Sequence, residues 1–337
     1  MRLEGKRFLV VGGGGLIGSH VVEALLREDV AEVIVYDNFC RGRIENLVNA
    51  QADSRFSVFE HGGDILQTDL LDAAMSEIDG VFHLAALWLL QCQEYPRAAF
   101  DVNIQGTFNV IEACVRNKVE RLVYSSSSSV YGDAVEEPMP EGHPYNNTTF
   151  YGATKIAGEH MCRAFHHRFK MSYVALRYMN VYGPRQDYRG AYIAVIMKML
   201  DRIDRGLSPI VFGDGLQAYD FVHVSDCATA NVVAMRSDTL DEFYNVGTGV
   251  RTTVLQVAEI LIELTGADCQ IQFEPEGQSF VTNRVGCPQK AMTDLDFEAR
   301  VKLRDGLMSL IQWRRATIAA ADRSRSTSTK SDSLSVE

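Results

Sequence analysis

The sequence predicts an α/β protein built around a doubly wound parallel sheet, with a smaller α/β lobe in the C-terminal half. Three observations support this class. Short β-rich runs alternate with longer amphipathic runs through the first half of the chain, the pattern of strand–helix–strand units. The strand runs, such as Phe8-Leu9-Val10-Val11, are almost wholly apolar, as expected where helices cover both faces of a sheet. The connections are short, which favours parallel strands joined by crossover helices.

Composition narrows the function classes. The chain has 337 residues, of which 46% are hydrophobic and 23% charged, so it is globular and long enough for a sizeable core. Its net charge of −11 argues against non-specific nucleic-acid binding. No apolar run approaches the ~20 residues that span a bilayer, and the N-terminus lacks the regions of a signal peptide. Seven scattered cysteines without a CxxC pair, and histidines without metal spacing, indicate a reduced, cytoplasmic protein with no metal site.

The order of the elements suggests a division of the chain. In the first half we expect strands at residues 7–11, 32–36, 56–61, 80–84, 121–125 and 172–177, and helices at 17–28, 66–77, 96–117 and 151–169. Further on we expect strands at 210–212, 242–245 and 271–274, and helices at 191–206, 225–236, 254–265 and 303–320. We therefore predict a cofactor domain at 1–178, to which 218–248 returns, and a substrate lobe at 179–217 and 249–320. The polar stretch 321–337 is expected to be a disordered tail.

A glycine-rich loop follows the first strand and opens the first helix. Two registers fit, Gly12-x-x-Gly15-x-x-Gly18 and Gly13-x-Gly15-x-x-Gly18. In both, the missing Cβ atoms let a pyrophosphate approach the backbone, and the N-terminus of the helix offers N–H groups and a positive dipole end. Glycine runs also occur in ordinary turns, but the strand before and the helix after favour a dinucleotide site.

An acidic residue closes the second strand. Asp37 lies 19 residues beyond Gly18, where a carboxylate accepts hydrogen bonds from both ribose hydroxyls and repels a 2′-phosphate. This favours NAD over NADP, although nearby Arg41 would weaken the preference, and Asp37 as a plain turn residue is the alternative. The loop and the acid together predict a Rossmann sheet that binds NAD.

The residue pair Tyr151 and Lys155 carries the second chemical signal. The two are spaced i, i+4 on one face of an expected helix. A serine run, Ser125 to Ser129, precedes them at the carboxyl end of a strand, where ligands bind in open α/β sheets. We expect the pKa of the phenol to fall from ~10 toward 7, because Lys155 and a cationic nicotinamide ring both favour the phenolate. The alternative is a structural tyrosine beside a solvated lysine.

At this point the sequence resembles the extended short-chain dehydrogenase/reductase superfamily, and within it the nucleotide-sugar epimerases and dehydratases of the UDP-glucose 4-epimerase type. The resemblance runs from about Arg7 to about Trp313. Its motifs are the glycine loop, Asp37-Asn38, Gly63-Asp64-Ile65, His83-Leu84-Ala85-Ala86, Asn103, Val130-Tyr131-Gly132, Tyr151-x-x-x-Lys155 and Arg177-Tyr-Met-Asn-Val-Tyr-Gly-Pro-Arg-Gln186.

The resemblance implies roles for individual residues. Tightly bound NAD would contact Gly12, Gly15, Leu16, Ile17, Gly18, Asp37, Asn38, Asp64, Ile65, Leu84, Ala85, Ala86, Asn103, Ser125, Tyr151, Lys155 and Tyr178. The catalytic residues would be Ser127, Tyr151 and Lys155. A nucleotide-diphosphate sugar would contact Trp88, Ser127, Ser128, Asn180, Arg185, Tyr219 and Arg284.

The residues just before Val130 indicate which reaction the family member performs. Relatives that dehydrate or decarboxylate the sugar resemble each other in carrying acidic residues there, whereas this chain has Ser128 and Ser129. That favours a 4-epimerase, which oxidises and re-reduces one carbon through a transient 4-keto sugar. A dehydratase or net oxidoreductase of the same family is the alternative. A non-catalytic NAD-binding regulator is disfavoured, because it would not need Ser127, Tyr151 and Lys155.

The substrate half departs from the family pattern. Tyr219 stands where relatives usually have an arginine that contacts the diphosphate, and a tyrosine cannot replace that bidentate fork. Arg185 or Arg189 is a candidate for the missing charge, with a solvated surface position as the alternative. Trp88 is expected either to wall the sugar pocket or to belong to the core. The segment 284–291 is also shorter than in galactose epimerases, so the nucleotide and the sugar stay open.

Helices at 100–117 and 151–169 are expected to pack against their copies in a homodimer, as in similar enzymes. Their apolar stripes fit ordinary core packing equally well.

Overall fold

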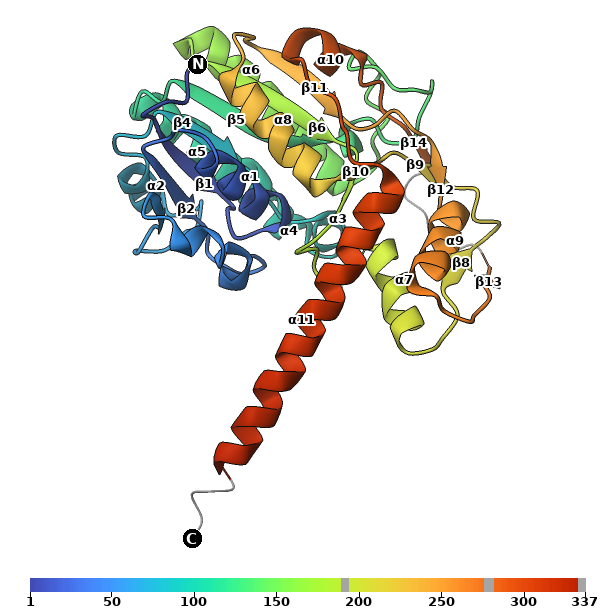
Figure 1. Cartoon of the computed structure of the whole chain (residues 1–337). Coiled ribbons are helices and arrows are strands. Elements are labelled where there is room, and N and C mark those ends of the chain that lie inside the picture. Colours follow the sequence, from blue (N-terminus) through green and yellow to red (C-terminus); the bar gives the residue numbers. More distant parts are fainter. Residues whose placement is uncertain (189–193, 276–281, 333–337) are drawn as a thin grey trace.

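The computed structural model describes residues 1–188, 194–275 and 282–332, with side chains up to residue 320. Its centre is a seven-stranded parallel sheet with strand order β11-β6-β5-β4-β1-β2-β3 (Figure 1). These strands are β1 (Arg7–Val11), β2 (Glu32–Tyr36), β3 (Phe56–Val58), β4 (Gly80–His83), β5 (Arg121–Ser127), β6 (Tyr173–Tyr178) and β11 (Glu242–Val246). The predicted doubly wound Rossmann sheet is confirmed.

Helices cover both faces of the sheet because successive residues of each buried strand point to opposite sides. On one face lie α1 (Leu16–Leu26) and α8 (Val224–Arg236), packed with Phe8 and Val10. On the other lie α2 (Thr68–Ala74), α5 (Thr107–Arg116) and α6 (Phe150–Phe169), packed with Leu9 and Val11. The strand order reverses between β1 and β4, and in such sheets ligands bind at the carboxyl ends around that point.

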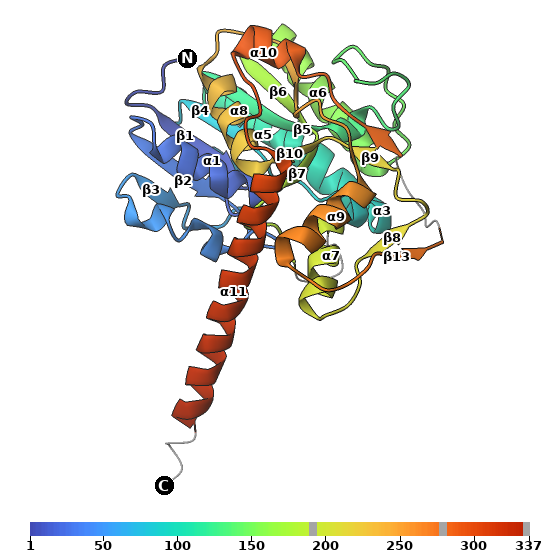
Figure 2. The same cartoon turned by 45° about the vertical axis from the view of Figure 1, so that its right-hand side comes forward.

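A smaller lobe lies beside the carboxyl ends of the strands (Figure 2). Its strands are β7 (Asn180–Tyr182) with β10 (Phe221–His223), then β9 (Ala218–Tyr219) between β12 (Thr252–Thr253) and β14 (Asn283–Arg284), and β8 (Ile210–Phe212) with β13 (Gln272–Glu274). Its helices are α7 (Val195–Asp204), α9 (Val254–Thr265) and α11 (Leu303–Asp332), while α10 (Gln289–Leu295) packs beside β11 of the large sheet. Between β10 and the last elements of this lobe, the chain returns through α8 and β11 to the main sheet.

Two expectations about helices differ from the structure. The long helix expected at 96–117 is three consecutive pieces: α4 (Pro96–Ala99), a wider π-helical stretch (Phe100–Gly106) and α5. Of the stretch 321–337 expected to be disordered, residues 321–332 continue α11 to Asp332 and project from the body (Figure 1), and residues 333–337 lie outside the described part of the chain. The polar composition of the tail suggested disorder, but this stretch has no Gly or Pro, and a helix already begun on the buried residues Leu307 and Leu310 propagates without a new nucleation step. Within the described part of the chain, no helix is long and apolar enough to cross a membrane.

Candidate active site

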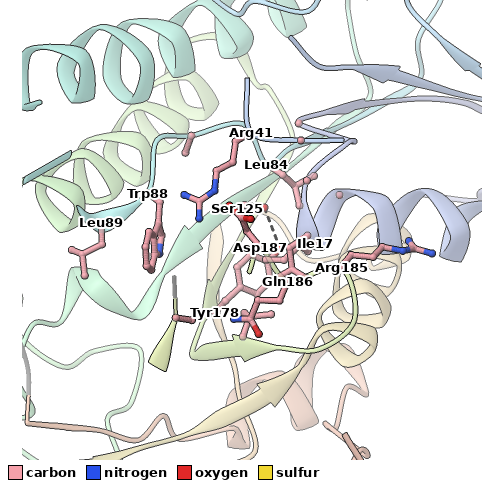
Figure 3. Close-up of a pocket in the computed structure, with 18 of the residues that line it drawn as sticks. Ile17, Arg41, Leu84, Trp88, Leu89, Ser125, Tyr178, Arg185, Gln186 and Asp187 are labelled. Carbon is pink, nitrogen blue, oxygen red and sulfur yellow. Dashed lines mark hydrogen bonds between the residues drawn. The ribbon is translucent and has the colours of Figure 1, made fainter. Parts of the chain in front are cut away.

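A cavity of about 1650 Å³ lies at the carboxyl ends of the main strands, between the sheet and the smaller lobe (Figure 3). The residues that the resemblance assigned to NAD, the sugar nucleotide or catalysis line it, with the exception of Asn103. From the cofactor half these are Gly12, Gly15, Leu16, Ile17, Gly18, Asp37, Asn38, Asp64, Ile65, Leu84, Ala85, Ala86, Ser125, Ser127, Tyr151, Lys155 and Tyr178. From the substrate set they are Trp88, Ser128, Asn180, Arg185, Tyr219 and Arg284.

The glycine loop forms one end of the cavity. A Cβ on Gly12, whose φ is +84°, would lie 2.6 Å from the backbone N of Ala85, and one on Gly18 would lie 2.2 Å from the carbonyl O of Gly12. A Cβ on Gly15 would meet only the Gly12 carbonyl O, at 3.3 Å, and Gly15 caps α1 without a side-chain hydrogen bond. The first turn of α1 therefore presents free N–H groups to the cavity. This cradle fits a pyrophosphate.

Asp37 borders the same end. Its Oδ2 accepts a hydrogen bond from the N–H of Gly14 and its Oδ1 from the N–H of Phe39, both at 2.8 Å. Burial raises the pKa of this carboxyl, and the two backbone donors oppose the rise. A Cβ on Gly63 would lie 2.1 Å from the backbone carbonyl carbon of Asp37, so Gly63 lets the two segments meet. The acid is held where a ribose beside the glycine loop would meet it.

Arg41 contacts Trp88, in the wall of the cavity, and Gln91. Its guanidinium lies over the ring of Trp88, 5.0 Å from the centroid, and its Nη1 donates to Oε1 of Gln91 at 3.5 Å. Figure 3 shows Arg41 reaching into the cavity toward the indole. Trp88 is thus a cavity residue, and Arg41 adds a cation to that wall.

Tyr151 and Lys155 lie on one face of α6, which begins at the cap residue Thr149. The Oγ1 of Thr149 accepts a hydrogen bond from the N–H of Gly152 at 3.1 Å, and this fixes the first turn that carries Tyr151. The Nζ of Lys155 lies 5.7 Å from the centroid of the Tyr151 ring and donates to the carbonyl O of Ser125 at 2.7 Å. Lysine and phenol are therefore ordered against the end of β5.

Burial shifts the pKa values of both members of this pair. Burial raises the pKa of Tyr151 to about 12, although a hydrogen bond with Ser127 and the charges of Arg284 and Arg41 pull it down. Burial also lowers the pKa of Lys155 to about 8. In the protein alone, desolvation of the phenolate outweighs these groups, so the expected fall toward 7 stays a prediction for the NAD-bound protein. A cation at the nicotinamide position would have to lower the pKa of Tyr151 the rest of the way.

The serine run completes the centre of the cavity. The Oγ of Ser127 accepts from the N–H of Ser129 at 3.1 Å. The Oγ of Ser125 and the hydroxyl of Tyr178 lie 3.2 Å apart, and Asn231 donates to that hydroxyl at 2.7 Å. Ser128 is buried in the short turn that follows the strand.

One predicted contact needs correction. Asn103 lies behind the cavity wall, where its Oδ1 accepts from the N–H of Leu87 (2.7 Å) and its Nδ2 donates to the Leu87 carbonyl O (3.0 Å). It holds the segment after β4 in place rather than facing the cavity. Arg185 lines the cavity and forms an ion pair with Glu23 of α1 through Nη2, while its Nη1 is buried without a hydrogen-bond partner, so its contact with a diphosphate stays a prediction. Arg189 lies outside the described residues.

Arg284 and Tyr219 form the substrate end of the cavity. Arg284 is 9% exposed, and burial lowers its pKa to about 10. Its Nη1 contacts Oγ of Ser129 and its Nε the carbonyl O of Gly132, both at 3.4 Å. Nearby, Nδ2 of Asn180 and Oε1 of Gln186 are buried without a hydrogen-bond partner. Sequence reasoning did not assign a role to Gln186, although it ends a motif that the resemblance includes. Groups of metal-ligating residues are absent from the part of the chain that the structure describes.

This geometry agrees with comparisons to known proteins. The model of the NAD-dependent epimerase/dehydratase family matches residues 8–247. The chain belongs to this family. NAD is accordingly the cofactor of the cavity, and the glycine cradle and Asp37 fit it.

Relatives in the epimerase/dehydratase family span several reactions. A putative UDP-glucose 4-epimerase of Methanocaldococcus jannaschii is 33% identical over 310 residues, covering 90% of this chain and 97% of that protein. A dTDP-glucose 4,6-dehydratase of Actinoplanes sp. is 32% identical over 92% of this chain and 98% of its own length. The solved UDP-N-acetylglucosamine 4-epimerase of Methanobrevibacter ruminantium superposes with a TM-score of 0.87 at 31% identity, over 93% of this chain and 99% of that one. The family therefore comprises enzymes on nucleotide sugars, both epimerases and dehydratases.

Proposed function

We propose that this protein is an NAD-dependent nucleotide-sugar 4-epimerase, which inverts C4 through a transient 4-keto sugar. The observation that carries the proposal is the composition of the cavity around Tyr151. Ser127 hydrogen-bonds the phenol and the neighbouring Ser128 and Ser129 present hydroxyls, so the run carries no carboxylate for proton transfer at a second carbon. Relatives named as UDP-glucose 4-epimerases support the same reading.

Each catalytic residue would have its own role in proton transfer. Tyr151, as phenolate, takes the proton of the 4-hydroxyl and returns one to the same oxygen after the sugar has turned over. Ser127 hydrogen-bonds that oxygen and passes its proton toward Tyr151. Lys155 favours the phenolate through its charge. Bound NAD supplies the reversible acceptance of a hydride, so the reaction has no net redox change.

The substrate end fits a sugar nucleotide with two phosphates. Arg284 is the buried guanidinium that would bind the diphosphate, and the unpartnered Nδ2 of Asn180 would donate to a phosphate oxygen. Arg41, stacked on Trp88, places a second guanidinium in the same cavity, which Tyr219 cannot provide.

A dehydratase or net oxidoreductase of the same family is the second candidate, because dehydratases and decarboxylases stand among the relatives at similar identity. Such an enzyme would lose water or carbon dioxide from the substrate, or release NADH. An epimerase does none of these.

We also propose that the enzyme acts as a cytoplasmic homodimer. Phe108 on α5 and Phe169 on α6 are 39% and 50% exposed and both contact Phe165, which makes an apolar face that a second copy would cover. The seven cysteines are all unpaired, as expected in a reducing compartment.

One experiment tests the reaction. Purified protein is incubated with UDP-, GDP-, CDP- and dTDP-sugars without added cofactor, and the configuration at C4 is followed by NMR. We expect interconversion of two C4 epimers with no net NADH. Tyr151→Phe should abolish turnover while NAD stays bound. Water loss, or a fully active Tyr151→Phe variant, would contradict the proposal.

A further inference from the structure

A fully buried ion pair lies directly behind the catalytic residues. The side chains of Arg177 on β6 and Glu159 on α6 are 1% and 0% exposed. They form a bidentate contact in which Nε donates to Oε1 and Nη2 to Oε2, each at 2.7 Å. The proposed reaction uses neither group.

Neighbouring hydroxyls complete the pair. Ser126 donates to Oε1 of Glu159 at 2.6 Å, and Tyr145 donates to Oε2 at 3.1 Å. Arg177 donates through Nη1 to the hydroxyl of Tyr131 at 2.9 Å. Every member of this group therefore has partners, which is the condition under which buried charges are tolerated. We name Ser126, Glu159 and Arg177 the ionic cluster.

Each member of the ionic cluster adjoins a cavity residue on its own element. Ser126 lies between Ser125 and Ser127 on β5. Glu159 lies one helical turn after Lys155 on α6. Arg177 directly precedes Tyr178 on β6. The three elements that carry the catalytic centre thus meet in one set of hydrogen bonds immediately behind it.

Stability alone does not require such a pair, because buried ion pairs are often replaced by apolar residues without loss of stability. A hydrogen-bonded charge pair instead fixes the orientation of the side chains that form it and of the strand and helix that carry them. On a strand, pinning Ser126 to one side directs Ser125 and Ser127 to the opposite side. The same pair fixes the position of α6 along β5, and therefore that of Lys155 against the Ser125 carbonyl O.

We propose that the ionic cluster of Ser126, Glu159 and Arg177 is a positioning device that aligns Ser127, Tyr151 and Lys155 for proton transfer. The inference rests on the proposed function for its kinetic readout. A displacement of about 1 Å at a reacting group can cost about 100-fold in rate, so loss of one link should appear in kcat.

Ser126→Ala is the variant of choice, because it detaches β5 from the cluster without leaving a charge unpaired. We expect kcat to fall about tenfold, with KM, NAD content and Tm close to those of the wild type. Ser126→Thr keeps the hydroxyl and should restore most of kcat. Ser237→Ala is the matched control, since Ser237 contacts another buried arginine, Arg121, away from the cavity, and it should leave kcat unchanged.

A second readout needs no substrate. Ionisation of Tyr151 in the NAD-loaded protein is followed by absorbance of the phenolate, and Tyr151→Phe identifies its signal. The groups that act on this phenol are Ser127 and Tyr124 on β5, Cys92 on α3 (Leu89–Glu94), Tyr178 on β6, Arg284 on β14, Arg41 after β2 and Lys155 on α6. Since none of them is changed in Ser126→Ala, a higher apparent pKa of Tyr151 would report misalignment.

The outcomes separate the two proposals. If the wild type converts no nucleotide sugar, the proposed function fails, and the phenol titration still decides on the ionic cluster. If Ser126→Ala keeps the wild-type kcat and the wild-type phenol ionisation, or if it changes only Tm, the cluster is merely structural and the inference is wrong.

Discussion

Tyr219 of β9 lies directly beside Arg284 of β14 in parallel register. The charge of Arg284 and the ring of Tyr219 thus share one wall of the cavity, and this wall holds one guanidinium where relatives usually supply a second arginine. The proposed diphosphate contact therefore rests on Arg284.

Arg284→Met should therefore raise KM for the nucleotide sugar about 10- to 100-fold, since hydrogen bonds to charged groups contribute about 1.5–3 kcal/mol. Steady-state kinetics measure this, with NAD content as the check on the cofactor half. Arg251→Met, on an exposed arginine outside the cavity, is the control. An unchanged KM would exclude Arg284 from substrate binding.

Binding of NAD⁺ should release protons. In the protein alone the pKa of Tyr151 is raised to about 12, so the phenol is protonated at pH 8. A cationic nicotinamide favours the phenolate and lowers this pKa, so protons are released between the lowered value and pH 12. Calorimetry in two buffers of different ionisation enthalpy measures the release. The prediction fails if Tyr151→Phe releases as many protons as the wild type.

Asp37→Ala should reduce the preference for NAD over NADP. The variant loses the acceptor for the ribose hydroxyls and the charge that repels a 2′-phosphate, and we expect the preference to fall about 10- to 100-fold. Titration of both cofactors by fluorescence quenching measures the ratio. Equal discrimination in wild type and variant would assign Asp37 to the turn alone.

Two glycines of the same loop should respond differently to alanine. At Gly18 the added Cβ meets the Gly12 carbonyl O at 2.2 Å, so Gly18→Ala should lower Tm by several degrees. At Gly15 the nearest atom lies at 3.3 Å, so Gly15→Ala should fold normally and lose NAD affinity, at least about tenfold, because it fills the pyrophosphate cradle. Thermal melts and the NAD content of the purified proteins separate the two effects.

The apolar face of α5 and α6 should determine the oligomeric state. Phe108 and Phe169 both contact Phe165 and form part of this face, so the double variant Phe108→Glu with Phe169→Glu should be monomeric in sedimentation. Phe273→Glu, on an exposed phenylalanine of β13, should leave the state unchanged. A wild-type monomer would refute the dimer.

Much of the cofactor half was predictable because its signals are local. The glycine loop, Asp37 and the pair Tyr151 and Lys155 each occupy the end of a strand or the start of a helix, and a parallel sheet brings those ends together. The orientation of a side chain was not predictable where it depends on a partner that is distant in the sequence. Arg185 turns to Glu23 and Asn103 to the Leu87 backbone, and neither partner is visible in the local pattern.

The pKa of Tyr151, the direction of Arg41 and the end of the last helix were likewise not predictable from local sequence. The raised pKa of Tyr151 comes from burial by several elements, which spacing along one helix does not report. Arg41 crosses to Trp88 from another loop, so its direction could not be read from its neighbours. At residues 321–332 composition suggested a coil, whereas the backbone continues the helix that precedes it.

The path of the chain through β11 limits how this protein can be recombined. The polypeptide leaves the large sheet after β6, visits the smaller lobe, and returns to place β11 beside β6 before leaving again. A chimera that exchanges the smaller lobe with that of another family member therefore needs more than one splice. A single cut after Tyr178 would strip the sheet of its outermost strand and of α8, and would leave neither fragment complete.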